Sequence, residues 1–327
     1  MELIEDILLK TNQLSVGYTQ KRKPLPILSG INLSLKRGEL VCLMGQNGVG
    51  KSTLLRTLSG VQTPLEGYVE LDGENIHQLS RIETAKRISL VLTERLNAGN
   101  LTVYEVVAMG RYPYIGLDIR LSNEDLDKLD EVIELVGIRT IVEKPIYQLS
   151  DGQLQKVMIA RALAQNGEII VLDEPTAHLD LNNRVSVIRL LKSLATTTGK
   201  LVLMATHELD LALQTADRLI LVDQKGGLSE GIPEDLVLNG TLDKVFDLKG
   251  FDLKTGKYQH ESGTLGDIQL IGDGYSYLWT KNALERVGFS VVDNGERSIE
   301  VMVGDNVIKW QYGKKYVTSI RDLIDLL

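Results

Sequence analysis

The sequence contains only one cysteine, Cys42, among its 327 residues. One cysteine excludes a disulfide framework, and its place in the apolar run ELVCLMG favours a buried strand residue over a reactive thiol. The chain lacks an apolar stretch near the ~20 residues that a membrane-spanning helix needs. Its acidic first segment, MELIEDILLK, differs from a secretory signal. These absences predict a cytoplasmic protein in a reducing compartment.

The chain also lacks an excess of positive charge. It has 36 Lys and Arg against 44 Asp and Glu, a formal net charge of -8, and no basic tail. Non-specific binding to nucleic acid depends on Lys and Arg neutralising phosphates. We therefore expect no nucleic-acid partner.

Short apolar runs alternate with helical patterns along most of the chain. ELVCLMG precedes KSTLLRTLSG, and EIIVLDEP and KLVLMATHE follow later. Runs without polar alternation are typical of parallel strands that are covered on both faces. Residues 122–137 begin with a capping Ser, end at Gly137 and place apolar side chains at helical spacing, which predicts an amphipathic helix. Its apolar residues are Leu126, Leu129, Ile133 and Val136.

The character of the sequence changes after about residue 248. We expect one domain over residues 1–248 and a small α/β domain over 249–327, a size within the range of independent domains. The pattern predicts strands at 268–271, 289–292, 298–304 and 307–312, with helices at 275–287 and in SIRDLIDLL. Asp293, Asn294 and Gly295 predict a hairpin turn. The aromatic residues occur at helix and strand spacing, which favours core positions for Tyr275, Tyr277, Trp279, Trp310, Tyr312 and Tyr316.

The segment GQNGVGKST matches the spacing G-x-x-x-x-G-K-[ST] between a predicted strand and a predicted helix. Glycines allow backbone N–H groups to converge on phosphate oxygens, and the helix N-terminus favours negative charge. We expect the Lys side chain to bridge the β- and γ-phosphates and the Ser hydroxyl to bind Mg²⁺. The alternative is a flexible turn before a helix. The predicted ATP-binding residues are Gly45, Asn47, Gly48, Val49, Gly50, Lys51, Ser52 and Thr53.

Two acidic residues end the buried strand in EIIVLDEP. Buried carboxylates are costly unless they are compensated, so a function is expected for them. We assign Asp173 to Mg²⁺ and Glu174 to the attacking water as its base. His207 follows a second apolar strand, where open α/β sheets place ligands, and is predicted to sense the γ-phosphate and orient Glu174. With Lys51, these residues predict a nucleotide hydrolase.

The order of these motifs resembles that of the ATP-binding cassette (ABC) family over about residues 8–240. GQNGVGKST is similar to its Walker A sequence, LSDGQ to its signature, IIVLDEP to its Walker B, AHLD to its D-loop and ATHELD to its H-loop. The resemblance implies an α/β P-loop NTPase cassette, with a mixed-sheet core and a helical subdomain, that hydrolyses ATP with Mg²⁺. Tyr18 lies where the family stacks an aromatic ring on adenine, although it could simply be an aromatic residue of an edge strand.

The resemblance further implies a dimer that encloses two ATP molecules. Each ATP meets the Walker motifs of one chain and the signature of the other, here Ser150, Gly152 and Gln153. Asp180 is then expected at the interface. Read locally, Ser150 and Gln153 also match a helix-capping box, so the same stretch is predicted to begin a helix.

Two positions depart from the family pattern. Most members have Gly where this chain has Asp151, and most have Gln where alignment places Glu94, with Thr93 as the neighbouring alternative. A glutamate can still bind Mg²⁺, but it adds negative charge beside the triphosphate. Glu94 is therefore predicted as a third metal ligand, beside Ser52 and Asp173.

Residues 100–117, NLTVYEVVAMGRYPYIGL, are similar to ATP-binding subunits of importers for iron-siderophores, haem and cobalamin. The resemblance implies a permease that spans the membrane, indirect action with a periplasmic or lipoprotein binding partner, and a position on the cytoplasmic face of the membrane. Most of Val103, Val106, Val107 and Met109 are expected to be helix core, and it is the stretch as a whole, especially GRYPY at 110–114, that favours this iron-complex subfamily. A soluble ABC ATPase without a transport role and an efflux subunit remain as alternatives.

Overall fold

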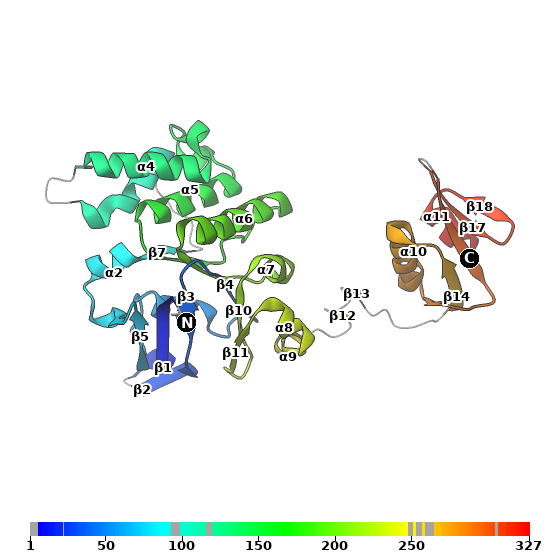
Figure 1. The fold of residues 1–327 in the computed structure, drawn as a ribbon, viewed down its shortest axis with the longest axis horizontal. Helices are drawn as coiled ribbons and strands as arrows, with labels where there is room; N and C mark the ends of the chain where they lie inside the picture. The colour runs from blue at the N-terminus through cyan, green and yellow to red at the C-terminus, as the bar shows by residue number, and fades with distance from the viewer. Residues whose placement is uncertain are drawn as a thin grey trace, which may run out of the picture. The chain divides into compact units, whose positions relative to one another are not determined.

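The apolar runs of the sequence lie together as the strands of one sheet in the computed structural model (Figure 1). Its order is β11-β10-β4-β9-β8-β7, parallel from β10 to β7, with β11 antiparallel at one edge. Nearly every side chain of the four central strands is buried, which confirms that both faces are covered. The strands are β4 (Leu40–Gly45), β7 (Ile88–Val91), β8 (Ile169–Asp173), β9 (Leu201–Ala205), β10 (Arg218–Val222) and β11 (Leu228–Gly231).

The structure describes residues 6–21, 23–92, 99–115, 120–247, 251–252, 257–258, 265–304 and 307–327. The chain divides into two units, residues 1–247 and residues 248–327. Each unit has its own buried core.

A second, antiparallel sheet completes the core of the first unit. It runs β2-β1-β5-β6, with β3 paired to β1, and α1 contacts both this sheet and the main sheet. Apolar side chains from both sheets and from α1 form one cluster, which includes Leu14, Leu43, Leu54 and Val171. The elements are β1 (Ile7–Gln20), β2 (Lys23–Ile31), β3 (Ser34–Lys36), β5 (Glu66–Leu71), β6 (Glu74–Asn75) and α1 (Lys51–Leu58).

A group of helices stands on the other side of the main sheet from β1, β2 and β5 (Figure 1). Among them, α4 has Ser122 as its N-cap and Gly137, at φ 71°, as its C-cap, as predicted; Leu126 is exposed, however, and Val132 fills the apolar face. The helices are α2 (Arg81–Arg87), α3 (Val103–Ala108), η2 (Met109–Tyr114), α4 (Asn123–Val136), η3 (Arg139–Ile141), η4 (Ile146–Gln148) and α5 (Asp151–Ala164). The predicted mixed-sheet core with a helical subdomain is therefore confirmed.

The remaining helices of the first unit lie between or after its strands along the chain. Helix α6 packs against β4 and β9, and α7 packs against β4 and α6. These helices are η1 (Ile76–Gln78), α6 (Leu181–Thr198), α7 (Leu209–Thr215), α8 (Pro233–Leu238) and α9 (Thr241–Phe246).

A buried ion pair fixes residues 110–114, GRYPY, inside the helical subdomain. Arg111 Nε donates to Asp125 Oδ1 at 2.7 Å, and both side chains are less than a tenth exposed. Arg111 also donates to the carbonyl of Ala164 at 2.8 Å, and the Tyr114 ring lies against its guanidinium at 3.9 Å. Much of the segment that resembles the iron-complex subfamily is therefore internal structure. Val103, Val106 and Val107 are likewise buried core, as their apolar spacing allowed.

Removing this guanidinium should destabilise the first unit strongly. Arg111→Ala leaves the Asp125 carboxylate buried without its charged partner, a change that typically costs about 3–5 kcal/mol. Thermal unfolding should show a large fall in midpoint. The matched control is Arg139→Ala, because Arg139 pairs with Asp130 and Glu134 on the surface and contributes little there. Equal shifts for the two variants would contradict a structural role for the buried pair.

Residues 265–304 and 307–327 of the second unit form a five-stranded sheet with two helices. Its order is β15-β14-β16-β17-β18, in which β15 and β16 both lie parallel to β14. All four predicted strands and both predicted helices are present, and β18 is an additional strand. They are β14 (Gly266–Ile271), α10 (Gly274–Val287), β15 (Phe289–Val292), β16 (Ser298–Val303), β17 (Ile308–Tyr312), β18 (Lys315–Val317) and α11 (Ile320–Leu326); β12 (Phe251–Asp252) and β13 (Lys257–Tyr258) form a separate pair.

The predicted hairpin at 293–295 is wrong. The strands on either side of it, β15 and β16, do not pair with each other, because β14 lies between them. The Asp-Asn-Gly segment therefore connects two parallel strands across a third strand.

The prediction that the aromatic residues of this unit form its core is only partly right. Trp310 is buried and donates its indole N–H to Thr280 Oγ1 at 2.6 Å, and Tyr277 and Tyr312 pack at the edge of the core. Tyr275, Trp279 and Tyr316 are instead exposed. Helical spacing cannot show which face of α10 meets the sheet, and the face with Leu284 does so.

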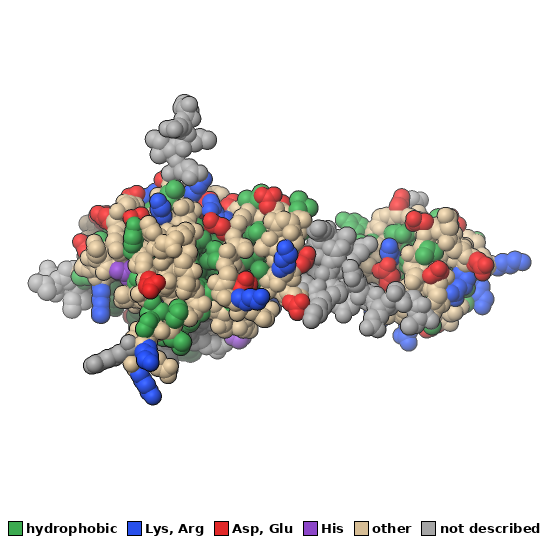
Figure 2. Space-filling model, turned by 90° about the horizontal axis from the view of Figure 1, so that it is seen from below, with side chains coloured by type: hydrophobic (Ala, Val, Ile, Leu, Met, Phe, Trp, Pro, Cys, Tyr) green, Lys and Arg blue, Asp and Glu red, His purple; other side chains and the backbone are tan. Residues whose placement is uncertain are grey.

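The surface carries both signs of charge. On the face in Figure 2, Lys and Arg side chains of the described residues are scattered among Asp and Glu. Within the described part of the chain, every helix is too short or too polar to cross a membrane.

Candidate functional site

The GQNGVGKST segment forms a tight loop between β4 and α1. Gly48 and Gly50 have φ of 82° and 106°, in the left-handed region that favours glycine. A side chain at Gly45 would lie 2.4 Å from the carbonyl oxygen of Val222, so this position requires a glycine as well. The loop geometry that the glycines were predicted to allow is therefore present.

The Lys51 side chain lies inside this loop. Its ammonium donates to the carbonyls of Gly45 at 2.8 Å and Gln46 at 2.9 Å, and the residue is only 6% exposed. Burial lowers the pKa of Lys51, while the charges of Glu174 and Asp173 oppose that shift. A cation held in this way at the N-terminus of α1 suits a phosphate chain.

The ends of neighbouring strands bring the predicted acids to the same place. Asp173 ends β8, opposite Ala205 at the end of β9, and Glu174 follows directly. Glu174 has a left-handed backbone, with φ of 50°, and donates its N–H to the carbonyl of Ala205 at 3.0 Å. Because of this turn, the Glu174 side chain no longer follows the alternation of side chains between the two faces of the sheet, and it lies at the carboxyl edge.

His207 lies beside Glu174 at the next strand end. Its Nδ1 is 3.8 Å from Glu174 Oε1 and its Nε2 is 3.7 Å from Glu208 Oε1, distances too long for hydrogen bonds. The imidazole is about half exposed, so it has room to move. The structure thus brings Lys51, Asp173, Glu174 and His207 to one edge of the sheet, as predicted for a hydrolase.

The donor set at this edge fits Mg²⁺. Ser52 and Asp173 offer a hydroxyl and a carboxylate, and among the described residues no cluster of three His, Cys, Asp or Glu could hold a metal by itself. Mg²⁺ is commonly held by one or two protein oxygens together with phosphates and water. Glu94 and its neighbour Thr93 lie outside the described residues.

Tyr18 lies beside the phosphate loop. It lies in β1, and its hydroxyl is 3.1 Å from Thr53 Oγ1, the last residue of the motif. The residue is 48% exposed. The ring is therefore available to a flat base next to the loop.

The LSDGQ segment begins α5. Ser150 Oγ accepts the N–H of Gln153 at 3.3 Å, and Gln153 Oε1 accepts the N–H of Ser150 at 3.1 Å, which confirms the predicted capping box. A side chain at Gly152 would lie 2.5 Å from the carboxamide of Asn183. Among the described residues, no hydrogen bond or ion pair joins Ser150, Gly152 or Gln153 to the phosphate loop of the same chain.

Asp180 caps α6. Its carboxylate accepts the backbone N–H and the side-chain amide of Asn183, both at 2.9 Å. Asn183 thus touches both the Asp180 carboxylate and the region of Gly152. The sequence pattern did not single out Asn183.

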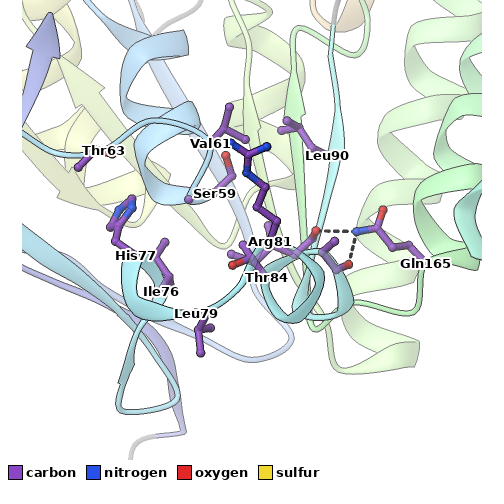
Figure 3. A pocket seen from close by; sticks show the side chains of 13 residues that line it. Ser59, Val61, Thr63, Ile76, His77, Leu79, Arg81, Thr84, Leu90 and Gln165 are labelled. Atoms are coloured by element: carbon purple, nitrogen blue, oxygen red, sulfur yellow. Dashed lines mark hydrogen bonds between the residues drawn. The ribbon is translucent and has the colours of Figure 1, made fainter. Parts of the chain in front are cut away.

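A pocket of about 620 Å³ lies between η1, α2, β7 and the segment that follows α1, apart from the phosphate loop (Figure 3). Gln165 closes one side by donating to the carbonyls of Ala85 and Ile88. Sequence reasoning did not find this pocket, since its lining comes from separate short segments. The labelled lining residues include Val61, His77, Arg81 and Leu90.

Two family models match the chain. The model described as ABC transporter matches residues 28–177, and the model described as iron ABC transporter C-terminal domain matches residues 265–327. The second match falls within the second structural unit.

Several curated proteins are similar to the first unit. An uncharacterized ABC transporter ATP-binding protein of Methanocaldococcus jannaschii is 40% identical over 74% of this chain and 82% of its own length. The ferric enterobactin transport ATP-binding protein FepC of Escherichia coli is 34% identical over 74% of this chain and 88% of its own. The iron(3+)-hydroxamate import ATP-binding protein FhuC of Bacillus subtilis is 35% identical over 73% and 88%.

Solved structures of ABC transporters are also similar to this chain. A metal-chelate-type ABC transporter in an inward-facing conformation matches with a TM-score of 0.64 and 27% identity, over 74% of this chain and 90% of the other. A dimeric bacterial ABC transporter cassette matches with a TM-score of 0.59 and 31% identity, over 69% and 99%.

Proposed function

Because this chain belongs to the ABC transporter family of ATP-binding proteins and is an ABC-type ATPase, we propose that it drives an importer for an iron complex or cobalamin. The observation that carries the cargo class is the match of residues 265–327 to an iron ABC transporter C-terminal domain. The names of FepC and FhuC, which concern ferric enterobactin and iron(3+)-hydroxamate, support the same class.

The active form proposed here is a homodimer that encloses two ATP molecules on the cytoplasmic face of the membrane. The similarity to a dimeric cassette supports this assembly. Each site combines the phosphate loop of one chain with Ser150, Gly152 and Gln153 of the other. Among the described residues, these three make no hydrogen bond or ion pair with the phosphate loop of their own chain, so they are available to a partner's ATP, as this sharing requires.

Residues of this chain supply the chemistry of hydrolysis. Lys51 and the loop amides hold the β- and γ-phosphates, and Tyr18 stacks on the adenine. Ser52 and Asp173, together with Glu94, would hold Mg²⁺, which would neutralise charge on the phosphates. Glu174 takes a proton from the attacking water, while His207, on the next strand end, contacts the γ-phosphate and orients Glu174.

The pocket beside α2 is the proposed contact for the permease. Within residues 100–117, Arg111 and the three Val side chains are buried and cannot contact a permease directly, although Tyr112 is exposed. The pocket is open, contains none of the ATP-binding residues and presents Val61, which is 65% exposed. Its lining is mixed, with Val61 and Leu90 beside His77 and Arg81, so an amphipathic cytoplasmic helix of the permease fits such a groove.

Co-purification and reconstitution test this function. The chain should purify with a multi-spanning permease, and vesicles containing both should accumulate a ferric siderophore or cobalamin only when ATP and a substrate-binding protein are present. Val61→Glu should lose the permease while keeping basal ATP hydrolysis. Leu238→Glu, an equally exposed apolar residue on α8, is the matched control. Purification with ribosomes or DNA, or outward movement of the cargo, would overturn the importer.

A further inference from the structure

The first turn of α6 connects two loops of the candidate site. Arg184 Nε donates to the carbonyl of Leu179 at 2.7 Å, next to Asp180. Its Nη1 donates to Glu208 Oε2 at 2.9 Å, next to His207. One planar guanidinium therefore holds the segment of Asp180 and the segment of His207 together, through a bond between Arg184 and Glu208, which lie 24 positions apart in the chain.

Glu208 is held tightly between its neighbours. Its side chain is 12% exposed, and its backbone N–H donates to Thr206 Oγ1 at 3.1 Å. While one carboxylate oxygen accepts from Arg184, the other lies 3.7 Å from His207 Nε2. Hydrogen bonds between ionised groups are among the strongest and most directional in proteins. Arg184 thus fixes the carboxylate that faces the imidazole.

The imidazole of His207 lies between two carboxylates. Glu208 faces Nε2 and Glu174 faces Nδ1, at 3.7 and 3.8 Å. Neither contact is a hydrogen bond at these distances, and an imidazole is oriented by the hydrogen bonds of its nitrogens, so a small shift that brings Glu208 within reach of Nε2 changes the direction in which the ring points. The connected groups run from the Asp180 segment through Arg184 and Glu208 to His207 and Glu174.

We propose that Arg184 and Glu208 are positioning residues that tie the orientation of His207 to the segment carrying Asp180. The inference rests on the proposed function, since it takes Asp180 as an interface residue and His207 and Glu174 as residues of hydrolysis. When the partner chain contacts Asp180 and displaces the Leu179 carbonyl, the guanidinium moves with it, and Glu208 follows. His207 is then aligned only in the closed dimer.

The test compares Arg184→Gln, Glu208→Gln, the double variant and Arg184→Lys in the full chain. ATP binding should be unchanged, whereas kcat per bound ATP should fall on the order of 10²-fold without a change in KM, since small misplacements of catalytic groups have effects of this size. The double variant should lose no more than either single one, because the two side chains act as a unit. Arg189→Gln, an exposed residue of the same helix, is the control for charge.

Arg184→Lys separates positioning from folding. A lysine can pair with Glu208 but cannot also hold the Leu179 carbonyl with a fixed fork. Arg184→Lys should unfold at a temperature close to that of the wild type but should keep the low kcat of Arg184→Gln. A wild-type kcat in Arg184→Lys would overturn the proposal. Glu208→Asp, which keeps the charge and shortens the reach, should also lose kcat; wild-type turnover in a folded Glu208→Asp protein would overturn it too.

His207→Ala and Glu174→Gln are measured alongside. If these two retain hydrolysis, the assignment of the hydrolytic residues fails. If they lose hydrolysis while the Arg184 and Glu208 variants retain it, only the positioning role fails.

Discussion

Glu174→Gln should bind ATP, form a stable ATP-dependent dimer and lose turnover by roughly 10²–10⁴-fold, the usual contribution of a general base. The amide keeps the size of the side chain but cannot accept a proton from water at neutral pH. The left-handed backbone at Glu174 and its N–H bond to Ala205 do not depend on the carboxylate, so the turn should persist. Size-exclusion chromatography with ATP and a phosphate-release assay measure both effects.

The matched control is Glu168→Gln, immediately before the start of the same strand. Glu168 pairs with Arg37 at 2.7 Å and Arg87 at 2.9 Å, far from the phosphate loop in the strand direction. Burial alone would raise its pKa, but the hydrogen bonds and charges of these two arginines lower it overall. This variant should unfold at a lower temperature yet retain turnover. Hydrolysis by Glu174→Gln at the wild-type rate would assign the base to another residue.

Sequence patterns located the candidate site because its chemistry depends on short spacings. The phosphate loop needs glycines at fixed positions before Lys51. Asp173 and His207 each follow a recognisable strand, and the carboxyl ends of parallel strands lie at one edge of the sheet. Similarly, Ser122 and Gly137 mark the two ends of α4 through backbone groups that only local residues satisfy. Such features require no knowledge of distant contacts.

Features that depend on distant partners were not predictable in this way. The Asp-Asn-Gly turn has hairpin chemistry, but β14 takes the place between β15 and β16, a choice decided by the whole sheet. The Arg184–Glu208 pair joins two charged side chains that separately resemble solvated surface residues. The Glu208 side chain is 12% exposed and that of Arg184 is 36% exposed, and the two meet only when α6 and the end of β9 are packed together.

Ser150→Arg is the variant that separates the two readings of LSDGQ, and it should leave ATP binding to the single chain intact while abolishing turnover. The bulky cation replaces a side chain that we propose to contact the γ-phosphate held by the partner chain, and loss of such a contact typically costs 10²–10³-fold in kcat or more. The substitution also removes the helix cap in which Ser150 Oγ accepts the N–H of Gln153, which should lower the free energy of unfolding by about 1 kcal/mol. Equilibrium ATP binding and phosphate release measure the separation.

Ser80→Arg is the control for the cap alone. Ser80 and Glu83 form the same capping box at the start of α2, with bonds of 3.2 and 2.7 Å, and neither is an ATP-binding residue. The chain without its permease should therefore hydrolyse ATP normally when Ser80 is replaced. Loss of ATP binding in the Ser150 variant would mean that the stretch serves the nucleotide of its own chain.

Mixed dimers test the sharing of sites directly. A Ser150→Arg chain keeps its own phosphate loop and Glu174, and a Glu174→Gln chain keeps its signature. In a mixed dimer these intact halves meet in one site, while both defects fall in the other site. Mixing two inactive proteins should thus restore measurable hydrolysis. If isolated, tagged mixed dimers remain inactive, each chain builds its ATP site alone. In that case every site carries the substitution of its own chain, and no intact site can form.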